Sequence, residues 1–127
     1  LSSHHAMWQF FEPQLDMQLK FSDEGNLTER VKLLLRGLLA GGPPQIERVA
    51  EQLSMSVRTL QRQLKQENTS FQKILTNLRH ELALHYLKNT DYSDVDIAFL
   101  LGYRETNSFK RGFRQWTGRS FGEFMRH

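Results

Sequence analysis

Two groups of basic and amide side chains recur at one spacing in this 127-residue sequence. They are Arg58, Gln61, Arg62 and Lys65, the first basic face, and Asn107, Lys110, Arg111 and Arg114, the second basic face. Positions i, i+3, i+4 and i+7 lie on one side of an α-helix. Arginine can pair with guanine, glutamine and asparagine can pair with adenine, and lysine or arginine can neutralise phosphates. The spacing therefore predicts two helices whose exposed faces contact double-stranded DNA.

Each basic face lies opposite an apolar face of the same expected helix, and we call these two helices the reader helices. The apolar residues are Val57, Leu60 and Leu64 in residues 57–67, and Phe109, Phe113 and Trp116 in residues 106–117. Neither basic face contains a carboxylate, whereas a merely solvated helix usually mixes glutamate with lysine. This difference favours DNA recognition over a solvated surface. The remaining alternative is a helical protein-interaction module whose basic faces bind an acidic partner.

The two reader helices belong to an internal repeat. Ala50 is followed four residues later by Ser54, and Ala98 is followed four residues later by Gly102. The first small residue lets two helices cross closely, and the second allows the sharp turn of a helix-turn-helix unit. Because the apolar residues of the second reader helix start one position later, we expect its turn to be one residue longer.

Helix start and stop signals recur along the chain, and no β-hairpin signal or period-two alternation occurs. They predict a helix over residues 27–40, ended by the Gly-Gly-Pro-Pro sequence of residues 41–44, and a longer helix over residues 71–88. Three capping boxes mark helix starts at Asn26 with Glu29, Ser93 with Asp96, and Ser120 with Glu123. The longest helix has an apolar stripe of Phe71, Ile74, Leu75, Leu78, Leu82 and Tyr86. The chain is therefore expected to be all-α.

The composition excludes several classes of function. The net charge is +3, and the basic excess lies in residues 44–127, which hold 13 basic and 9 acidic residues. Cysteine is absent, which excludes disulfides, thiolate zinc sites and cysteine nucleophiles. His80 and His85 would point about 140° apart on a helix, so they cannot share a metal ion. We expect no metal, no cofactor, no catalytic residue, no enzymatic activity and no membrane-spanning segment.

The second copy of the repeat carries the more specific motif. It contains Ile97-Ala98, then Gly102-Tyr103, then Phe113, Trp116 and Gly118 in order. With this series and with residues 49–62, the segment 44–127 resembles the C-terminal DNA-binding domain of the AraC/XylS family of bacterial transcription regulators. The resemblance implies about seven helices in two helix-turn-helix units, joined by a long linker helix. It also implies that the two recognition helices enter successive major grooves.

By matching positions, the resemblance assigns base reading to eight residues of this chain. They are Arg58, Gln61, Arg62, Thr106, Asn107, Ser108, Lys110 and Arg111. Phosphate contacts are expected at Lys65, Arg104 and Arg114. Asn68 stands where the family usually has glycine, and a left-handed backbone is expected there. Glu105 would be unfavourable close to phosphates, so we expect it to cap the helix that follows.

The expected organisation is a connector followed by a DNA-binding domain. The connector spans residues 1–43 with an extra N-terminal helix; residues 44–69 form the first helix-turn-helix unit, 70–90 the linker helix, and 93–127 the second unit with a C-terminal helix. Such domains usually follow a sensing domain, so we expect the DNA-binding end of a longer regulator that dimerises through that domain. The expected partner is double-stranded DNA, with RNA polymerase as a candidate second partner, in the bacterial cytoplasm and nucleoid.

Overall fold

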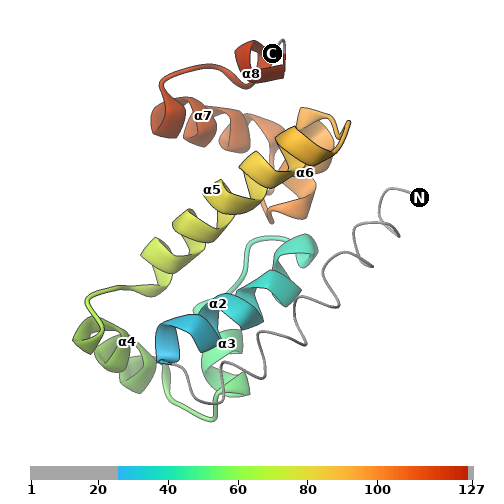
Figure 1. Cartoon of the computed structure of the whole chain (residues 1–127). Helices are drawn as coiled ribbons and strands as arrows, with labels where there is room; N and C mark the ends of the chain where they lie inside the picture. The colour runs from blue at the N-terminus through green and yellow to red at the C-terminus, as the bar shows by residue number, and fades with distance from the viewer. Residues whose placement is uncertain (1–25, 126–127) are drawn as a thin grey trace. The chain divides into compact units, whose positions relative to one another are not determined.

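The computed structural model describes residues 26–125 (Figure 1). Within this range it contains α-helices, one short 3-10 helix and no strand, which confirms the predicted all-α fold. The elements are α2 (Leu27–Leu38), η1 (Leu39–Gly41), α3 (Ile46–Gln52), α4 (Val57–Gln66), α5 (Phe71–Asn89), α6 (Asp94–Leu100), α7 (Thr106–Thr117) and α8 (Phe121–Met125). The part of the predicted connector before residue 26 lies outside the described residues.

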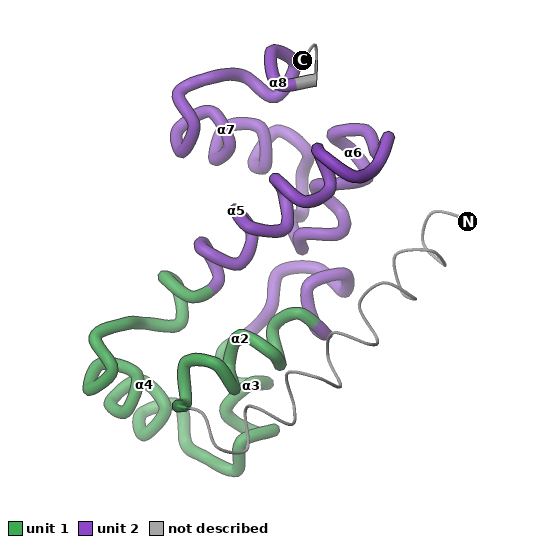
Figure 2. Tube along the Cα trace, viewed as in Figure 1, with its two compact units in different colours: residues 1–36, 46–74 green, residues 37–45, 75–127 purple. Residues whose placement is uncertain are grey.

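The described chain divides into two compact units (Figure 2). Unit 1 contains residues 26–36 and 46–74, and unit 2 contains residues 37–45 and 75–125. Helix α2 therefore contributes most of its length to unit 1, whereas η1 belongs to unit 2 and contacts α6. Each unit contains one of the two copies of the repeat, α3 with α4 or α6 with α7.

Helix α2 begins where its capping residue predicts. The Asn26 Oδ1 atom accepts a hydrogen bond from the backbone N–H of Glu29 at 3.0 Å. The α-helix ends at Leu38, two residues earlier than expected, because the chain tightens into η1 before Gly42, whose φ of +110° stops the helix. Its buried side chains are Leu27, Val31, Leu33 and Leu35.

The first N–H groups of α2 also bond to a carboxylate at the end of α4. Glu67 accepts hydrogen bonds from the N–H of Leu27 at 3.0 Å, from the N–H of Thr28 at 2.9 Å and from the Thr28 hydroxyl at 2.6 Å. Burial alone would raise the pKa of Glu67, but the bonds from Thr28 and Leu27 outweigh it and hold the pKa below its ordinary value. Glu67 therefore joins α2 to the first reader helix within unit 1.

Replacing Glu67 with glutamine should lower the free energy of unfolding at pH 7 by about 1 kcal/mol, because a charged acceptor at a helix N-terminus is lost. Since the pKa of Glu67 is lowered in the folded state, its contribution is present above the unfolded pKa of about 4.3. It disappears as the pH falls through the lower folded-state pKa. Urea denaturation of wild type and Glu67→Gln at pH 7 and pH 3 measures this change.

The stability difference between wild type and Glu67→Gln should shrink on acidification. Glu51→Gln is the matched control, because Glu51 is exposed on α3 in the same unit. It should change the free energy of unfolding by less than about 0.5 kcal/mol at pH 7. An effect of Glu67→Gln that is the same at both pH values would contradict the proposed role of the ionised carboxylate.

The core of unit 2 forms along α5, beyond its first turn. Most of the predicted apolar stripe of α5 is buried, whereas Phe71 is only half-buried. Arg79 donates hydrogen bonds to the carbonyl oxygens of Leu101 at 2.7 Å and Gly102 at 3.0 Å. Its guanidinium also lies 4.1 Å from the centroid of the Tyr103 ring. Arg79 thus fixes α5 to the turn between α6 and α7.

Candidate nucleic-acid interface

The turns of the two helix-turn-helix units close in the same way. Each contains one left-handed residue, Ser54 with a φ of +56° or Gly102 with a φ of +80°. After α3, the N–H groups of Ser54 and Met55 donate hydrogen bonds to the carbonyl oxygens of Glu51 and Ala50, respectively. After α6, the N–H groups of Gly102 and Tyr103 donate in the same pattern to the carbonyl oxygens of Phe99 and Ala98. Residues 53–56 form the first turn and residues 101–105 the second, so the predicted extra residue is present.

Helix α4 presents the first basic face to solvent. It is capped by Ser56, whose Oγ accepts a hydrogen bond from the N–H of Thr59 at 3.1 Å. Leu60 and Leu64 are fully buried, and α4 packs on α3. The exposed residues of the face are Arg58, Gln61, Arg62 and Lys65. After the helix, Asn68 has a φ of +62°, which confirms the left-handed backbone expected there.

Helix α7 presents the second basic face in the same way. Phe109 and Phe113 are each 2% exposed, and they contact Phe121 of α8 with ring centroids 5.3 and 5.6 Å apart. The exposed residues of the face are Asn107, Lys110, Arg111 and Arg114. The structure therefore brings together the four residues of each predicted face, on helices with nearly the predicted bounds.

Trp116 does not take the buried position predicted for it. The indole is 37% exposed and stacks on the imidazole of His80 from α5, with the ring centroids 3.8 Å apart and the planes 7° apart. Burial lowers the pKa of His80, so the stacked ring favours its neutral form. Trp116 still contacts Phe113, with ring centroids 5.9 Å apart and planes at 83°, but its position one turn beyond Phe113 lies at the margin of the core.

The start of α7 differs from expectation at Glu105. Glu105 occupies the N-cap position, but its side chain accepts no hydrogen bond from the helix, so the predicted capping role is wrong. Glutamate is longer than the side chains that close such a cap. Of the other candidates, Arg104 is exposed, whereas Thr106 and Ser108 are half-buried. The Ser108 Oγ accepts a long hydrogen bond of 3.4 Å from the guanidinium of Arg111, which restrains that side chain.

Lys110 has a partner that the sequence analysis missed. Its Nζ lies 3.4 Å from the Oδ2 of Asp94, the first residue of α6. No local signal identifies this pair, because the two residues lie 16 positions apart on different helices. The second basic face also borders a cavity of about 250 Å³, which is lined by Asn107, Lys110, Arg111, Arg114, Ser120 and Phe121. Ser120 and Phe121 were not among the predicted site residues.

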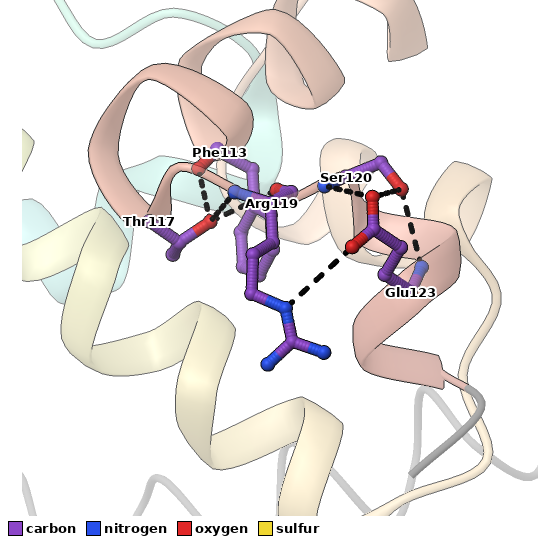
Figure 3. Close-up of polar contacts among 5 residues, drawn as sticks. All are labelled: Phe113, Thr117, Arg119, Ser120 and Glu123. Carbon is purple, nitrogen blue, oxygen red and sulfur yellow. Dashed lines mark hydrogen bonds and ion pairs between the residues drawn. The ribbon is translucent and has the colours of Figure 1, made fainter.

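Polar contacts among five residues close the turn between α7 and α8 (Figure 3), and Ser120 of this turn lines the cavity. The Thr117 hydroxyl lies 2.8 Å from the carbonyl oxygen of Phe113 and 2.9 Å from that of Arg119, so it closes the end of α7. The Ser120 Oγ accepts a hydrogen bond from the N–H of Glu123 at 3.2 Å, and the Glu123 carboxylate faces back toward Ser120 and Arg119. The Ser120 N–H also donates a hydrogen bond to the Glu123 Oε1 at 3.5 Å, so the capping box predicted at Ser120 is confirmed.

Two helix-turn-helix units, each with a cationic and amide-bearing face on its second helix, define a DNA-binding protein of the helix-turn-helix class. Residues 49–127 match the sequence model of a family described as a helix-turn-helix domain. The chain belongs to this AraC/XylS-type family of transcription regulators. Family membership confirms the predicted class of domain, which is the DNA-binding helix-turn-helix domain of transcription regulators.

Individual relatives agree with this assignment. The chain is 39% identical over 116 residues to the ornithine utilization regulator of Pseudomonas aeruginosa, covering 90% of this chain and 34% of the relative. It is 39% identical over 93 residues to the transcriptional activator RhaS of Escherichia coli, covering 71% of this chain and 34% of the relative. The chain thus spans about a third of the length of these curated relatives.

Solved structures share the fold. A DNA-binding transcriptional dual regulator from Escherichia coli K-12 superimposes with a TM-score of 0.73 at 27% identity, covering 80% of this chain and 91% of that one. The transcriptional regulator CdpR from Pseudomonas aeruginosa gives a TM-score of 0.68 at 34% identity, covering 79% of this chain and 31% of that one.

None of the helices in residues 26–125 has the length and hydropathy needed to cross a bilayer.

Proposed function

We propose that the two reader helices, α4 and α7, bind double-stranded DNA sequence-specifically in two successive major grooves. The observation that carries this proposal is the repeated arrangement of an exposed basic face opposite buried apolar anchors, on the second helix of each helix-turn-helix unit. A buried anchor row fixes the rotation of each helix about its axis, so the same side chains always face outward. An α-helix fits the major groove of B-DNA, and grooves on one side of the duplex repeat every ~34 Å.

Each basic face combines two kinds of contact. Arg58, Gln61 and Arg62 on α4 are the base-reading candidates of the first unit, and Lys65 at the end of that face meets a phosphate. On α7 the base-reading candidates are Asn107, Lys110 and Arg111, with Thr106 and Ser108 less accessible. Arg114 and Arg104 flank α7 as phosphate contacts. The half-buried positions of Thr106 and Ser108 support a smaller contribution from them than from the exposed residues.

The protein that contains this domain then regulates transcription by binding to an operator. The relatives named above are regulators, and the chain matches about a third of their length. We infer that dimerisation and effector sensing reside in a separate domain and that RNA polymerase is the second partner. DNA as the ligand places its action at the bacterial nucleoid in the cytoplasm. The connector before residue 44 would link this domain to the sensing domain.

The first test is Arg62→Ala, for which we expect a loss of about 1–3 kcal/mol of binding free energy and a relaxed preference at one base position. The operator is first obtained by selection from random duplex DNA at fixed salt, where two short conserved blocks about one helical turn apart are expected. Arg111→Ala should act on the other block. Binding titrations on duplexes mutated in either block measure both effects.

Arg30→Ala is the control, because Arg30 is exposed on α2. This substitution removes the same charge and changes no residue of a reader helix. It should change the affinity for all sequences by a similar, small factor. If Arg62→Ala and Arg111→Ala relax the same block, the two-groove arrangement is wrong. If duplex DNA shows no sequence preference and an acidic protein binds both basic faces instead, the interaction-module alternative is correct.

A further inference from the structure

Lys110 differs from the other cations of the basic faces because a carboxylate holds it. Its Nζ lies 3.4 Å from the Oδ2 of Asp94, and the two side chains are 48% and 31% exposed. Within residues 26–125, the structure shows no ion pair for Arg58, Arg62, Arg111 or Arg114, which reach solvent without a carboxylate partner. Asp94 therefore lies beside the second basic face, where its charge would act on a bound polyanion.

The position of Asp94 is itself fixed. Its Oδ1 accepts a hydrogen bond from the N–H of Val95 at 2.8 Å, so each carboxylate oxygen has a separate partner. Asp94 is the first residue of α6, where the helix dipole favours a negative charge. The residue before it, Ser93, forms a complete capping box with Asp96, with bonds of 3.1 and 3.2 Å. Asp94 thus reaches α7 from a rigid helix start.

We propose that Asp94 is a positioning residue that determines specificity, because it directs Lys110 to a base edge and weakens the binding of non-specific DNA. This inference rests on the proposed function of the second basic face. A lysine ammonium has three donors, so Lys110 can keep one on Asp94 while offering the others to the O6 and N7 acceptors of guanine. The restraint also limits the rotamer freedom that a lysine otherwise loses on binding.

On non-specific DNA the same pair is a disadvantage. There the protein gains mainly from neutralising phosphates, and the gain grows with the number of free cations. The Asp94 carboxylate neutralises Lys110 and repels nearby phosphates, so this residue pair contributes little to non-specific affinity. The pair therefore widens the difference between the operator and other sequences, since specificity is the ratio of the two affinities.

The test is Asp94→Asn, which keeps the side-chain oxygen that accepts from Val95 and removes the charge. We expect the affinity for non-specific duplex DNA to rise roughly three- to tenfold at 0.1 M salt, with the dependence of log affinity on log salt steeper by about one. The affinity for the selected operator should rise less or fall, and the base preference opposite Lys110 should relax. The ratio of specific to non-specific affinity should therefore decrease.

Asp91→Asn is the matched control, because Asp91 is an exposed aspartate in the segment between α5 and α6. This substitution changes the net charge by the same amount as Asp94→Asn. It should raise both affinities by the same factor and leave the ratio unchanged. The substitution Lys110→Met removes the partner of Asp94. In a Lys110→Met variant, Asp94→Asn should therefore leave the ratio of specific to non-specific affinity unchanged. Circular dichroism of each variant verifies that the helices remain folded.

Two outcomes of the Asp94→Asn measurements would overturn the inference and leave the proposed function standing. In one, Asp94→Asn changes operator and non-specific affinity equally, as Asp91→Asn does. In the other, Asp94→Asn lowers the ratio by the same factor with or without Lys110, which would assign the effect to bulk charge or helix stability. A wild-type chain that shows no sequence preference would overturn the proposed function itself, and this inference with it. A preference that Asp94→Asn leaves intact would overturn only the inference.

Discussion

Replacing Phe109 with alanine should lower the free energy of unfolding of unit 2 by about 3–5 kcal/mol, because a buried phenyl ring is deleted and a cavity remains. Phe109 is 2% exposed, and its ring lies 5.8 Å from the rings of Tyr103 and Phe113 and 5.3 Å from that of Phe121, centroid to centroid. Two of these rings, Tyr103 and Phe121, lie outside α7, so Phe109 connects α7 to the preceding turn and to α8. A loss of this size is a large part of the 5–15 kcal/mol that stabilises a typical domain.

The functional consequence should be confined to the second reader helix. Without Phe109, α7 loses one of the two buried rings that fix its rotation, so protection of the second operator block should disappear before that of the first. Urea denaturation followed by circular dichroism measures the stability, and footprinting at low temperature measures the two blocks. Phe109→Leu, which retains most of the apolar volume, should show an intermediate loss in both measurements if the alanine variant is largely unfolded.

Phe99→Ala provides the control, because it makes the same phenylalanine-to-alanine change at a side chain of α6 that is 51% exposed. Its cost should be about 1 kcal/mol or less, as for surface substitutions. Equal destabilisation by the two variants would contradict the role of Phe109 as the anchor of α7. Simultaneous loss of both operator blocks in a folded Phe109→Ala variant would show that the two reader helices do not act as separate contacts.

Gly102→Ala should cost unit 2 about 2–5 kcal/mol, for two separable reasons. The backbone of Gly102 has a φ of +80°, and an L-residue pays about 1–2 kcal/mol for the left-handed conformation. An added Cβ would also lie 2.7 Å from the carbonyl oxygen of Leu39 and 2.9 Å from that of Gly42. Because these are backbone atoms, relieving the overlap moves the chain and costs about 1–3 kcal/mol more.

Gly118→Ala separates the cost of the left-handed backbone from the cost of the steric overlap. Gly118 has a φ of +78°, but nothing lies within 4 Å of the Cβ that alanine would add. This control should therefore cost only the backbone term of about 1–2 kcal/mol. The difference between the two variants in urea denaturation measures the close approach of residues 39–42 to the turn. Equal losses would show that η1 does not contact Gly102 in solution.

The local features of this fold could be predicted from the sequence because they depend on neighbouring residues. The capping boxes at Ser93 and Ser120 form between residues three apart, and the structure contains both. Both turns follow from a small residue four positions after Ala50 or Ala98, and the extra residue of the second turn follows from the later start of the apolar residues in the helix after it. Where local reasoning failed, as at Glu105, the residue was at the right place but its side chain had the wrong length.

What the sequence by itself determined is which side chains share a face of each helix, because the 3.6-residue period fixes their directions around one axis. This was enough to predict both basic faces and most of their buried anchors. Only the tertiary structure decided which groups meet across helices: Glu67 with Thr28, Asp94 with Lys110, and Trp116 with His80. Periodicity contains no information about the distance between two helices, and that distance is set by packing of the core. The carboxylate beside the second basic face, and with it the proposed control of specificity, follows from that packing.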